Sequence, residues 1–168
     1  LIIERYRRGA SVLSMPRKIL FVCTGNTCRS PMAEGIFRKA VGDANYEVSS
    51  AGVAAQPGCS ASRETLEVLR DQGVELPGFR SRMVDKEILK DAEAVFCMTA
   101  SHLEMLEMMF PEFEEKYHLA CDFVECNGQV GVDVPDPIGM GRQAYDSVSR
   151  VMNEAMGGII GFLDERAE

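Results

Sequence analysis

The chain has 168 residues, 46% of them hydrophobic, and a formal net charge of −8. This length and composition predict a single globular domain with a buried apolar core. The negative charge argues against nucleic acid and anionic membranes as partners, and no apolar stretch is long enough to cross a bilayer. Any anion that binds this chain must therefore be held by a local group of donors.

Residues 1–17 are expected to lie outside the folded domain, which we place at residues 18–168. Arg5, Arg7 and Arg8 interrupt any apolar core of a secretory signal. We interpret the segment as a flexible arm, a tag remnant or the tail of an upstream segment. The lack of an export signal favours a cytoplasmic protein with reduced cysteines.

The six cysteines do not require a disulfide framework, because a chain of this size can bury enough apolar surface without one. Cys23 and Cys28, like Cys121 and Cys126, have four residues between them, a spacing at the loose end of zinc-site patterns. We therefore expect no metal site.

Strands and helices are expected to alternate along the chain. In order, we predict a strand at 18–23, a helix from Ser30 to Gly42, a strand at 46–53, a helix at 62–72, a short helix at 84–92, a strand at 94–98, a helix at 100–110, a strand at 117–124 and a final helix from about 142 onward. This order predicts an α/β fold with three layers, in which a doubly wound, four-stranded parallel sheet carries helices on both faces.

Three local details accompany these elements. Ser30 followed by Pro31 indicates a helix N-cap with proline in the first turn. Methionines 105, 108 and 109 fall at helical spacing, so core packing is favoured over a partner-binding groove. The glycine pair 157–158 is expected to break the final helix.

The loop at residues 23–30, CTGNTCRS, joins the first strand to the first helix at the carboxyl edge of the sheet, where ligands bind in such folds. Its backbone N–H groups can bind an oxyanion, and Gly25 permits the tight turn. Arg29 offers a planar fork to two phosphate oxygens. The positive surroundings favour the thiolate of Cys23, which makes Cys23 a candidate nucleophile for in-line attack on phosphorus.

Attack on phosphorus requires an acid that protonates the leaving group. The segment DVPDPIG at 133–139 supplies Asp136 on a proline-stiffened loop at the same edge of the sheet. Asp133 is the alternative acid, but Asp136 directly precedes Pro137 and is favoured. A Cys–His pair is less attractive, because His102 and His118 both lie far from these loops in the sequence.

The motif VCTGNTCRSPMAEG, together with SAG at 50–52 and the distant DP, resembles the low-molecular-weight protein tyrosine phosphatase family from residue 18 to the C-terminus. The resemblance implies that Cys23 is the nucleophile, Arg29 the phosphate clamp and Asp136 the general acid. It also implies a phosphate-binding loop formed by Thr24, Gly25, Asn26, Thr27, Cys28 and Ser30, with Asn26, Ser30 and Ser50 in a supporting hydrogen-bond network. Phosphorylated proteins would be the substrates, with phosphate or another oxyanion bound in the loop and no metal or organic cofactor. Cys28 could form a reversible disulfide with Cys23, or simply fill space.

Substrate choice within the family depends on the residue before the second loop cysteine and on the residues after DP, here Thr27 and Ile138. In this respect the loop is most similar to the bacterial protein arginine phosphatases, in which this threonine is a hallmark. Protein phosphoarginine is thus the expected substrate, and phosphotyrosine is the alternative. It also stays open that Thr27 is merely a tolerated loop residue without a role in substrate choice. Many relatives carry a histidine in the supporting network, and the corresponding place in this chain is Phe79. Either the alignment slips here or the network lacks one member, which puts the rigidity of the loop in question.

Two other functions are less favoured. Thioredoxin-coupled arsenate reductases share this fold and loop, but they need a pair of further cysteines near the third strand with six residues between them. Here Cys97 could be the first of that pair, but Glu104 stands in the place of the second. A non-catalytic phosphate-binding module would be expected to have lost Cys23, Arg29 or Asp136, and all three are present.

Overall fold

The computed structural model describes residues 15–126 and 128–167, so residues 1–14 of the predicted arm lie outside the described part. Arg17, which the prediction assigned to the arm, is the first residue of a strand. The elements are, in chain order, β1 (Arg17–Cys23), α1 (Arg29–Val41), β2 (Tyr46–Gly52), α2 (Arg63–Asp71), α3 (Lys86–Asp91), β3 (Ala94–Cys97), α4 (Ala100–Met109), a 3-10 helix (Pro111–Lys116), β4 (Tyr117–Leu119), a second 3-10 helix (Ala120–Phe123), β5 (Glu125–Cys126), β6 (Gln129–Val130) and α5 (Arg142–Glu165).

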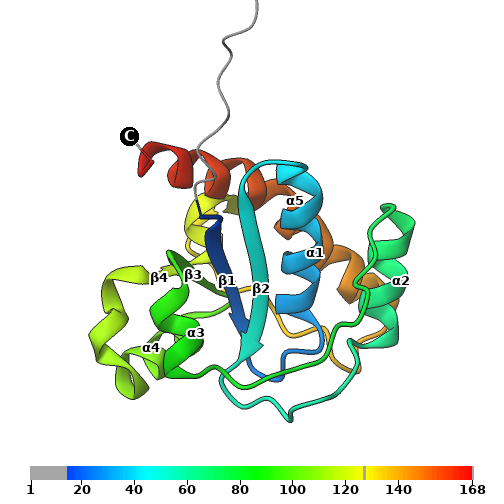
Figure 1. Ribbon diagram of the computed structural model, residues 1–168. Helices are drawn as coiled ribbons and strands as arrows, with labels where there is room; N and C mark the ends of the chain where they lie inside the picture. The colour runs from blue at the N-terminus through cyan, green and yellow to red at the C-terminus, as the bar shows by residue number, and fades with distance from the viewer. Residues whose placement is uncertain (1–14, 127, 168) are drawn as a thin grey trace, which may run out of the picture.

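The main sheet has four parallel strands in the order β2-β1-β3-β4. Helices cover both of its faces, as Figure 1 shows, which confirms the predicted three-layer α/β fold. β1 lies between β2 and β3 and is buried from Ile19 to its last residue, Cys23, which explains its unbroken apolar sequence. The chain leaves β1 toward β2 on one side and later returns to β3 on the other, so the carboxyl end of β1 is a topological switch point.

Alternate residues of β1 serve the two faces of the sheet. Phe21 belongs to the core shared with α1, α2 and α5, where its ring meets that of Phe37 at 5.7 Å. Leu20 faces the opposite layer, where it packs in a second core with Leu89 of α3 and Leu106 of α4. Each face thus has its own apolar core.

The fourth strand is shorter than predicted. The expectation of a strand at 117–124 is wrong beyond Leu119, because the chain turns into a 3-10 helix and then a short antiparallel hairpin, β5–β6. The apolar side chains that suggested a longer strand are used differently: the ring of Phe123 packs against Phe96 at 5.6 Å and Phe162 at 5.0 Å. Apolar residues in a short segment predict burial more reliably than they predict strand.

The predicted break at Gly157-Gly158 is also wrong, because α5 runs without interruption over 24 residues. A Cβ atom added at Gly158 would lie 2.5 Å from the carbonyl oxygen of Phe123. Glycine is therefore required at this position because the helix passes very close to the backbone of the second 3-10 helix.

Two further details of the helices differ from expectation. Helix α1 begins at Arg29 with Cys28 as its N-cap, so Ser30 is not the N-cap and its hydroxyl has other partners. The methionines of α4 do not pack in the core: Met108 is 84% exposed, and Met105 and Met109 are also exposed. The buried side of α4 is formed by His102 and Leu106, which are one helical turn apart.

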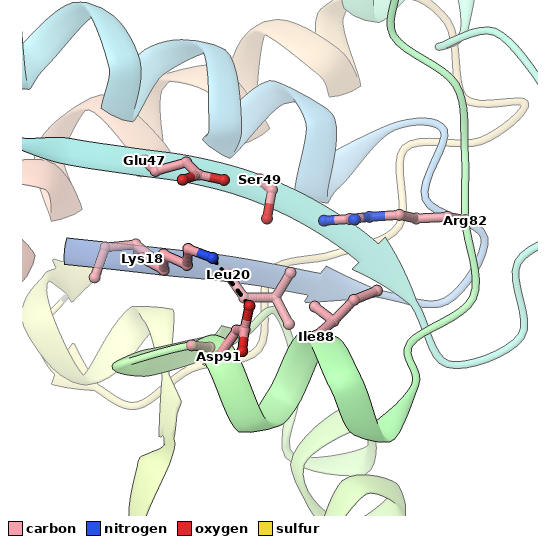
Figure 2. Close-up of a pocket in the computed structure, with 9 residues that line it drawn as sticks. Lys18, Leu20, Glu47, Ser49, Arg82, Ile88 and Asp91 are labelled. Atoms are coloured by element: carbon pink, nitrogen blue, oxygen red, sulfur yellow. Dashed lines mark hydrogen bonds and ion pairs between the residues drawn. The ribbon is translucent and has the colours of Figure 1, made fainter. Parts of the chain in front are cut away.

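A shallow hollow of about 100 Å³ lies where α3 leaves β1 and β2 partly uncovered (Figure 2). Lys18 Nζ and Asp91 Oδ2 form an ion pair 2.9 Å long beside it, and Glu47, Ser49 and Arg82 lie across from that pair. No cysteine or histidine lines this hollow.

Candidate active site

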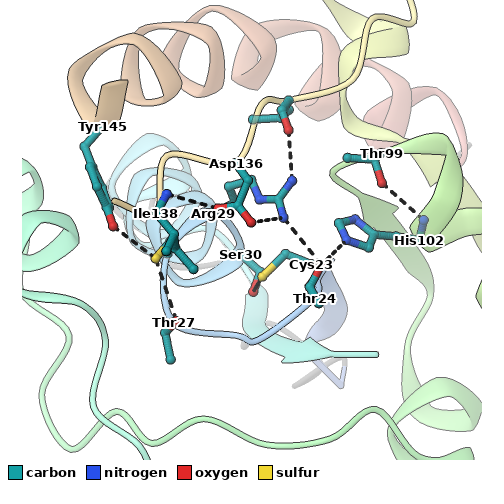
Figure 3. Close-up of polar contacts among 12 residues, drawn as sticks. Cys23, Thr24, Thr27, Arg29, Ser30, Thr99, His102, Asp136, Ile138 and Tyr145 are labelled. Carbon is teal, nitrogen blue, oxygen red and sulfur yellow. Dashed lines mark hydrogen bonds and ion pairs between the residues drawn. The ribbon is translucent and has the colours of Figure 1, made fainter. Parts of the chain in front are cut away.

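The loop that links β1 to α1 forms a cavity of about 130 Å³ at the carboxyl edge of the sheet (Figure 3). Loop residues 23–25 and 27–29 line it together with Asp136 and Ile138. Strand β1 delivers the first of these residues, and the first turn of α1 delivers the last. The N-terminus of a helix favours anions, so the cavity lies where an anion can bind.

The structure brings together the three side chains that the sequence proposed for chemistry. Cys23 and Arg29 are buried, with 2% and 5% of their surfaces exposed. Arg29 Nη2 lies 3.3 Å from Asp136 Oδ2, although the two residues are 107 positions apart in the chain. Arg29 Nη1 also donates to the carbonyl oxygen of Val134 at 3.0 Å, which fixes the guanidinium at the wall of the cavity.

The structure distinguishes the two candidate acids. Asp133 Oδ1 accepts a 2.7 Å hydrogen bond from the backbone N–H of Ala100, so Asp133 stabilises the start of α4. Asp136 lines the cavity, and 48% of its side chain is exposed. Its Oδ1 accepts from the N–H of Ile138 at 3.1 Å, which orients the carboxyl group. Of the two carboxyl groups, Asp136 is therefore the one that borders the cavity.

Asn26 holds the loop in shape. It has φ of +55°, the only positive φ among the described residues other than glycine, and asparagine tolerates that region better than most residues. Its side-chain Nδ2 donates to Ser30 Oγ and Ser50 Oγ, both at 2.9 Å. Its Oδ1 accepts from the backbone N–H of Arg82 at 2.9 Å. Every polar atom of this buried amide side chain is bonded, as a rigid buried network requires.

The network extends from the cysteine to a carboxylate that sequence reasoning missed. Ser30 Oγ lies 3.0 Å from Cys23 Sγ, and Ser50 Oγ donates to Glu34 Oε2 at 2.7 Å. Glu34 is buried, and its other oxygen pairs with Arg38 at 2.7 Å one turn along α1. A charge among the apolar residues of the buried side of α1 was the available signal for Glu34.

Phe79 makes no hydrogen bond to this network through its side chain; it packs against the apolar core. Positive charge reaches the network from other residues. Arg38 pairs with Glu34, and Arg82 Nε donates to the carbonyl oxygen of Ser50 at 3.0 Å. The network therefore has its cations without a histidine at position 79.

Gly52, the last residue of the SAG motif, lies directly beneath the loop. A Cβ atom at this position would come within 2.3 Å of the carbonyl oxygen of Thr24 and 3.0 Å of the backbone nitrogen of Asn26. Only glycine permits this close approach of β2 to the loop.

The side of the cavity expected to select the substrate carries Thr27, Cys28 and Ile138. Thr27 Oγ1 lies 3.7 Å from Cys28 Sγ, and the hydroxyl of Tyr145 lies 3.4 Å from the same sulfur on its other side. Burial, and then the contact with Cys28, raises the pKa of Tyr145 to about 12, so its phenol is neutral. Ile138 is 60% exposed at the rim.

His102 is a second neighbour of the site that the sequence did not reveal. It lies in the first turn of α4, where its backbone N–H donates to the capping hydroxyl of Thr99 at 3.2 Å. Its ring reaches across to the loop, with Nε2 at 2.7 Å from Thr24 Oγ1 (Figure 3). The chain distance of 78 residues explains why sequence reasoning set this histidine aside.

Within residues 15–126 and 128–167, no group of three or more histidine, cysteine or acidic side chains is placed to hold a metal ion. Over the same residues, no helix combines the length and the apolar composition that crossing a bilayer requires.

Comparison with known proteins gives a consistent result. The family profile described as "Low molecular weight phosphotyrosine protein phosphatase" matches residues 18–167. A "Protein-arginine-phosphatase" of Geobacillus stearothermophilus is 41% identical over 131 residues, which cover 78% of this chain and 85% of the relative. A "Low molecular weight protein-tyrosine-phosphatase" of Streptomyces coelicolor is 32% identical, with 92% of this chain and 98% of the relative covered. The solved structure of "YwlE arginine phosphatase from Geobacillus stearothermophilus" matches with a TM-score of 0.80 at 36% identity, covering 90% of this chain and 95% of that one.

Proposed function

We propose that this chain, which belongs to the low molecular weight phosphotyrosine protein phosphatase family, removes phosphate from phosphoarginine residues of proteins. The observation that carries the proposal is that Cys23, Arg29 and Asp136 line one anion-sized cavity at a helix N-terminus. A nucleophile, a fixed cation and an acid are the three groups that phosphoryl transfer through a covalent intermediate needs.

In the first step, the phosphate group lies in the loop, where backbone N–H groups and the Arg29 guanidinium hold its oxygens. The thiolate of Cys23 attacks phosphorus in line, so that an S–P bond forms while the P–N bond to the arginine side chain breaks. Asp136 gives its proton to the departing nitrogen, which leaves as the neutral group and takes up its final proton from water. The Ser30 hydroxyl, 3.0 Å from Cys23 Sγ, stabilises the thiolate before attack.

In the second step, the Asp136 carboxylate takes a proton from a water molecule whose oxygen attacks phosphorus. The S–P bond breaks, inorganic phosphate leaves, and Cys23 is again a thiolate. Both steps use only groups of this chain and water, so turnover should persist in the presence of a metal chelator.

Thr27 supports phosphoarginine as the substrate. Its side chain lines the cavity beside Cys28, where a hydroxyl can orient a guanidinium, and the relative from G. stearothermophilus bears the name of a protein-arginine-phosphatase. Phosphotyrosine is the second candidate, because Ile138 and Met140, which are 60% and 70% exposed, offer an apolar surface near the rim to an aromatic ring. The relative from S. coelicolor is named a protein-tyrosine-phosphatase.

The deciding experiment measures kcat/KM for phosphoarginine and phosphotyrosine peptides of matched sequence, on the wild-type chain and on Thr27→Ile. We expect the wild type to favour phosphoarginine and Thr27→Ile to shift the preference toward phosphotyrosine by about tenfold or more. A wild type that prefers phosphotyrosine, with no change in Thr27→Ile, would overturn the choice of substrate but leave the phosphatase reaction intact.

The remaining features of the proposal follow from charge and composition. We place the catalytic domain at residues 17–168, because β1 begins at Arg17, and expect it to act in the cytoplasm on phosphorylated proteins, without nucleic acid or membrane as a partner. The net charge of −8 supports the last point.

A further inference from the structure

The Thr24 hydroxyl lies where the loop at residues 23–30, called the anion loop below, meets α4. Two nitrogen atoms lie near its oxygen (Figure 3). His102 Nε2 is 2.7 Å from Thr24 Oγ1, and Arg29 Nη2 is 3.5 Å from the same oxygen. Thr24 also lines the cavity that contains Cys23. The imidazole of His102 therefore contacts the anion loop through this one hydroxyl group.

His102 is held as a neutral imidazole. Its side chain is buried, and burial together with the nearby Arg29 cation lowers the pKa of His102 to about 4. The charged groups that face it are Arg29 from α1 and Asp133 and Asp136 from the segment before α5. At neutral pH, one ring nitrogen thus carries a hydrogen and the other a lone pair.

The surroundings of Nδ1 indicate which nitrogen carries the hydrogen. Nδ1 is buried and has no hydrogen-bond partner among the described residues. A buried N–H without an acceptor is rarer in proteins than an unused acceptor lone pair. This places the hydrogen on Nε2, where it can be donated to Thr24 Oγ1.

We propose that His102 is a positioning residue for this site, because its Nε2–H donates to Thr24 Oγ1 and turns the Thr24 hydroxyl hydrogen toward the anion cavity. With His102 and Arg29 both donating, the two lone pairs of Thr24 Oγ1 are occupied. The hydroxyl hydrogen then donates to an oxygen of a bound phosphate group, beside the backbone N–H groups of the loop. This role of His102 rests on the proposed function of the cavity and adds a side-chain donor to it.

The tautomer of His102 is the first test, and it needs no variant with altered activity. Two-bond nitrogen–proton correlation NMR of the full chain at neutral pH distinguishes the Nε2–H tautomer from the Nδ1–H tautomer. We expect the Nε2–H pattern for His102. The Nδ1–H pattern would overturn the proposal, because Thr24 would then donate to the ring and not to phosphate.

Variants provide the second test, with inorganic phosphate as the probe and calorimetry as the measurement. Thr24→Val, which keeps the shape but removes the hydroxyl, should weaken phosphate binding about 10- to 100-fold, as expected for a hydrogen bond to a charged group. Thr24→Ser should restore binding to within about threefold of the wild type. His102→Ala should weaken binding about tenfold, and adding His102→Ala to Thr24→Val should cause no further loss, because His102 acts through Thr24.

Additive losses in the double variant, or failure of Thr24→Ser to restore binding, would overturn the proposal. The matched control is His118→Ala, which removes the other histidine, whose Nε2 is also buried without a hydrogen-bond partner in the described residues and whose ring packs on Phe162 at 4.8 Å. Phosphate affinity should not change in His118→Ala.

Two further outcomes keep the tests independent. If His102→Ala fails to fold, the tautomer of the wild type and the two Thr24 variants still decide the matter. If the wild type binds phosphate but hydrolyses no phosphopeptide, the proposed function fails, while the role of His102 in anion binding is still decided by the same binding data.

Discussion

Two neighbouring strands of the sheet end on a cysteine, and only one of these cysteines lies in a cavity. Cys23 ends β1 and Cys97 ends β3, and in the parallel pairing of these strands Val22 lies opposite Cys97. Cys23 faces the α1 side and borders the anion loop. Cys97 faces the other layer, packs with Leu89 and Leu106, and has no exposed surface.

The difference shows that the end of a parallel strand does not by itself make a cysteine reactive. Burial in an apolar core raises the pKa of Cys97 far above its usual range, so its thiol is inert. Cys23 is nearly as buried, but Ser30 Oγ lies 3.0 Å from its sulfur, and the helix N-terminus and Arg29 lie beside it. These polar neighbours distinguish the surroundings of Cys23 from the apolar packing around Cys97.

The largest expected effect separates the two cysteines directly. Cys23→Ser should lower kcat by at least about a thousandfold, because the nucleophile is lost. Cys97→Ala should keep kcat/KM within about twofold and lower the free energy of unfolding by about 1–2 kcal/mol, since it removes a small buried side chain. Steady-state kinetics with a phosphopeptide and urea unfolding test both statements. Substantial turnover in Cys23→Ser would show that Cys23 is not the nucleophile.

The two acidic residues of the 133–139 segment should differ in a similar way. Asp136→Asn should lower kcat about a hundredfold or more for substrates with poor leaving groups, and less for an activated aryl phosphate, because only the former need the acid. Asp133→Asn should leave kcat nearly unchanged and destabilise the chain by about 1 kcal/mol or less through the start of α4. An equal loss across leaving groups in Asp136→Asn would contradict its role as general acid.

A smaller effect is expected when the loop keeps its backbone but loses its amide network. Asn26→Gly accepts the φ of +55° and removes the bonds to Ser30, Ser50 and the N–H of Arg82, so kcat should fall about tenfold. Asn26→Ala should lose the same bonds and, because its φ is strained, a further 1 kcal/mol or so of stability. If Asn26→Gly had wild-type kcat, the network would serve stability alone.

The last prediction concerns pH and His102, which lies in the first turn of α4, the helix that follows β3. Because the folded pKa of His102 is lowered to about 4, the unfolded chain binds more protons than the folded chain between that pH and the ordinary value of 6.5. Stability should therefore rise with pH across this window, by up to about 1.4 kcal/mol per pH unit, and level off above it. Urea unfolding at several pH values measures the free energy of unfolding of the wild type and of His102→Gln. The difference between the two should change with pH inside the window and stay constant above it. If the free energies of both proteins depend on pH in the same way throughout, His102 is not held neutral by the fold.

The local parts of the site were predictable because they are written in consecutive residues. A buried strand, a glycine-containing loop and a helix start bring Cys23 and Arg29 to the same edge of the sheet, and a second loop at that edge brings in Asp136. Contacts that depend on packing between distant elements were not predictable: His102 reaches Thr24 across 78 positions, and the bond from Ser50 to Glu34 joins β2 to α1. The same holds for Gly158, whose role is visible only when Phe123 is placed against α5.

The partners of Asn26 also determine when a folding chain becomes active. Ser50 and Arg82, which hold the Asn26 amide, lie 24 and 56 residues further along the chain. A partly folded molecule that has formed only β1 and α1 contains Cys23 and Arg29, but the side-chain bonds from Ser50 and Arg82 that hold the loop at Asn26 are still missing. During refolding, catalytic turnover should thus recover only in molecules that have folded completely. Its recovery should lag behind the return of the circular dichroism signal of the helices.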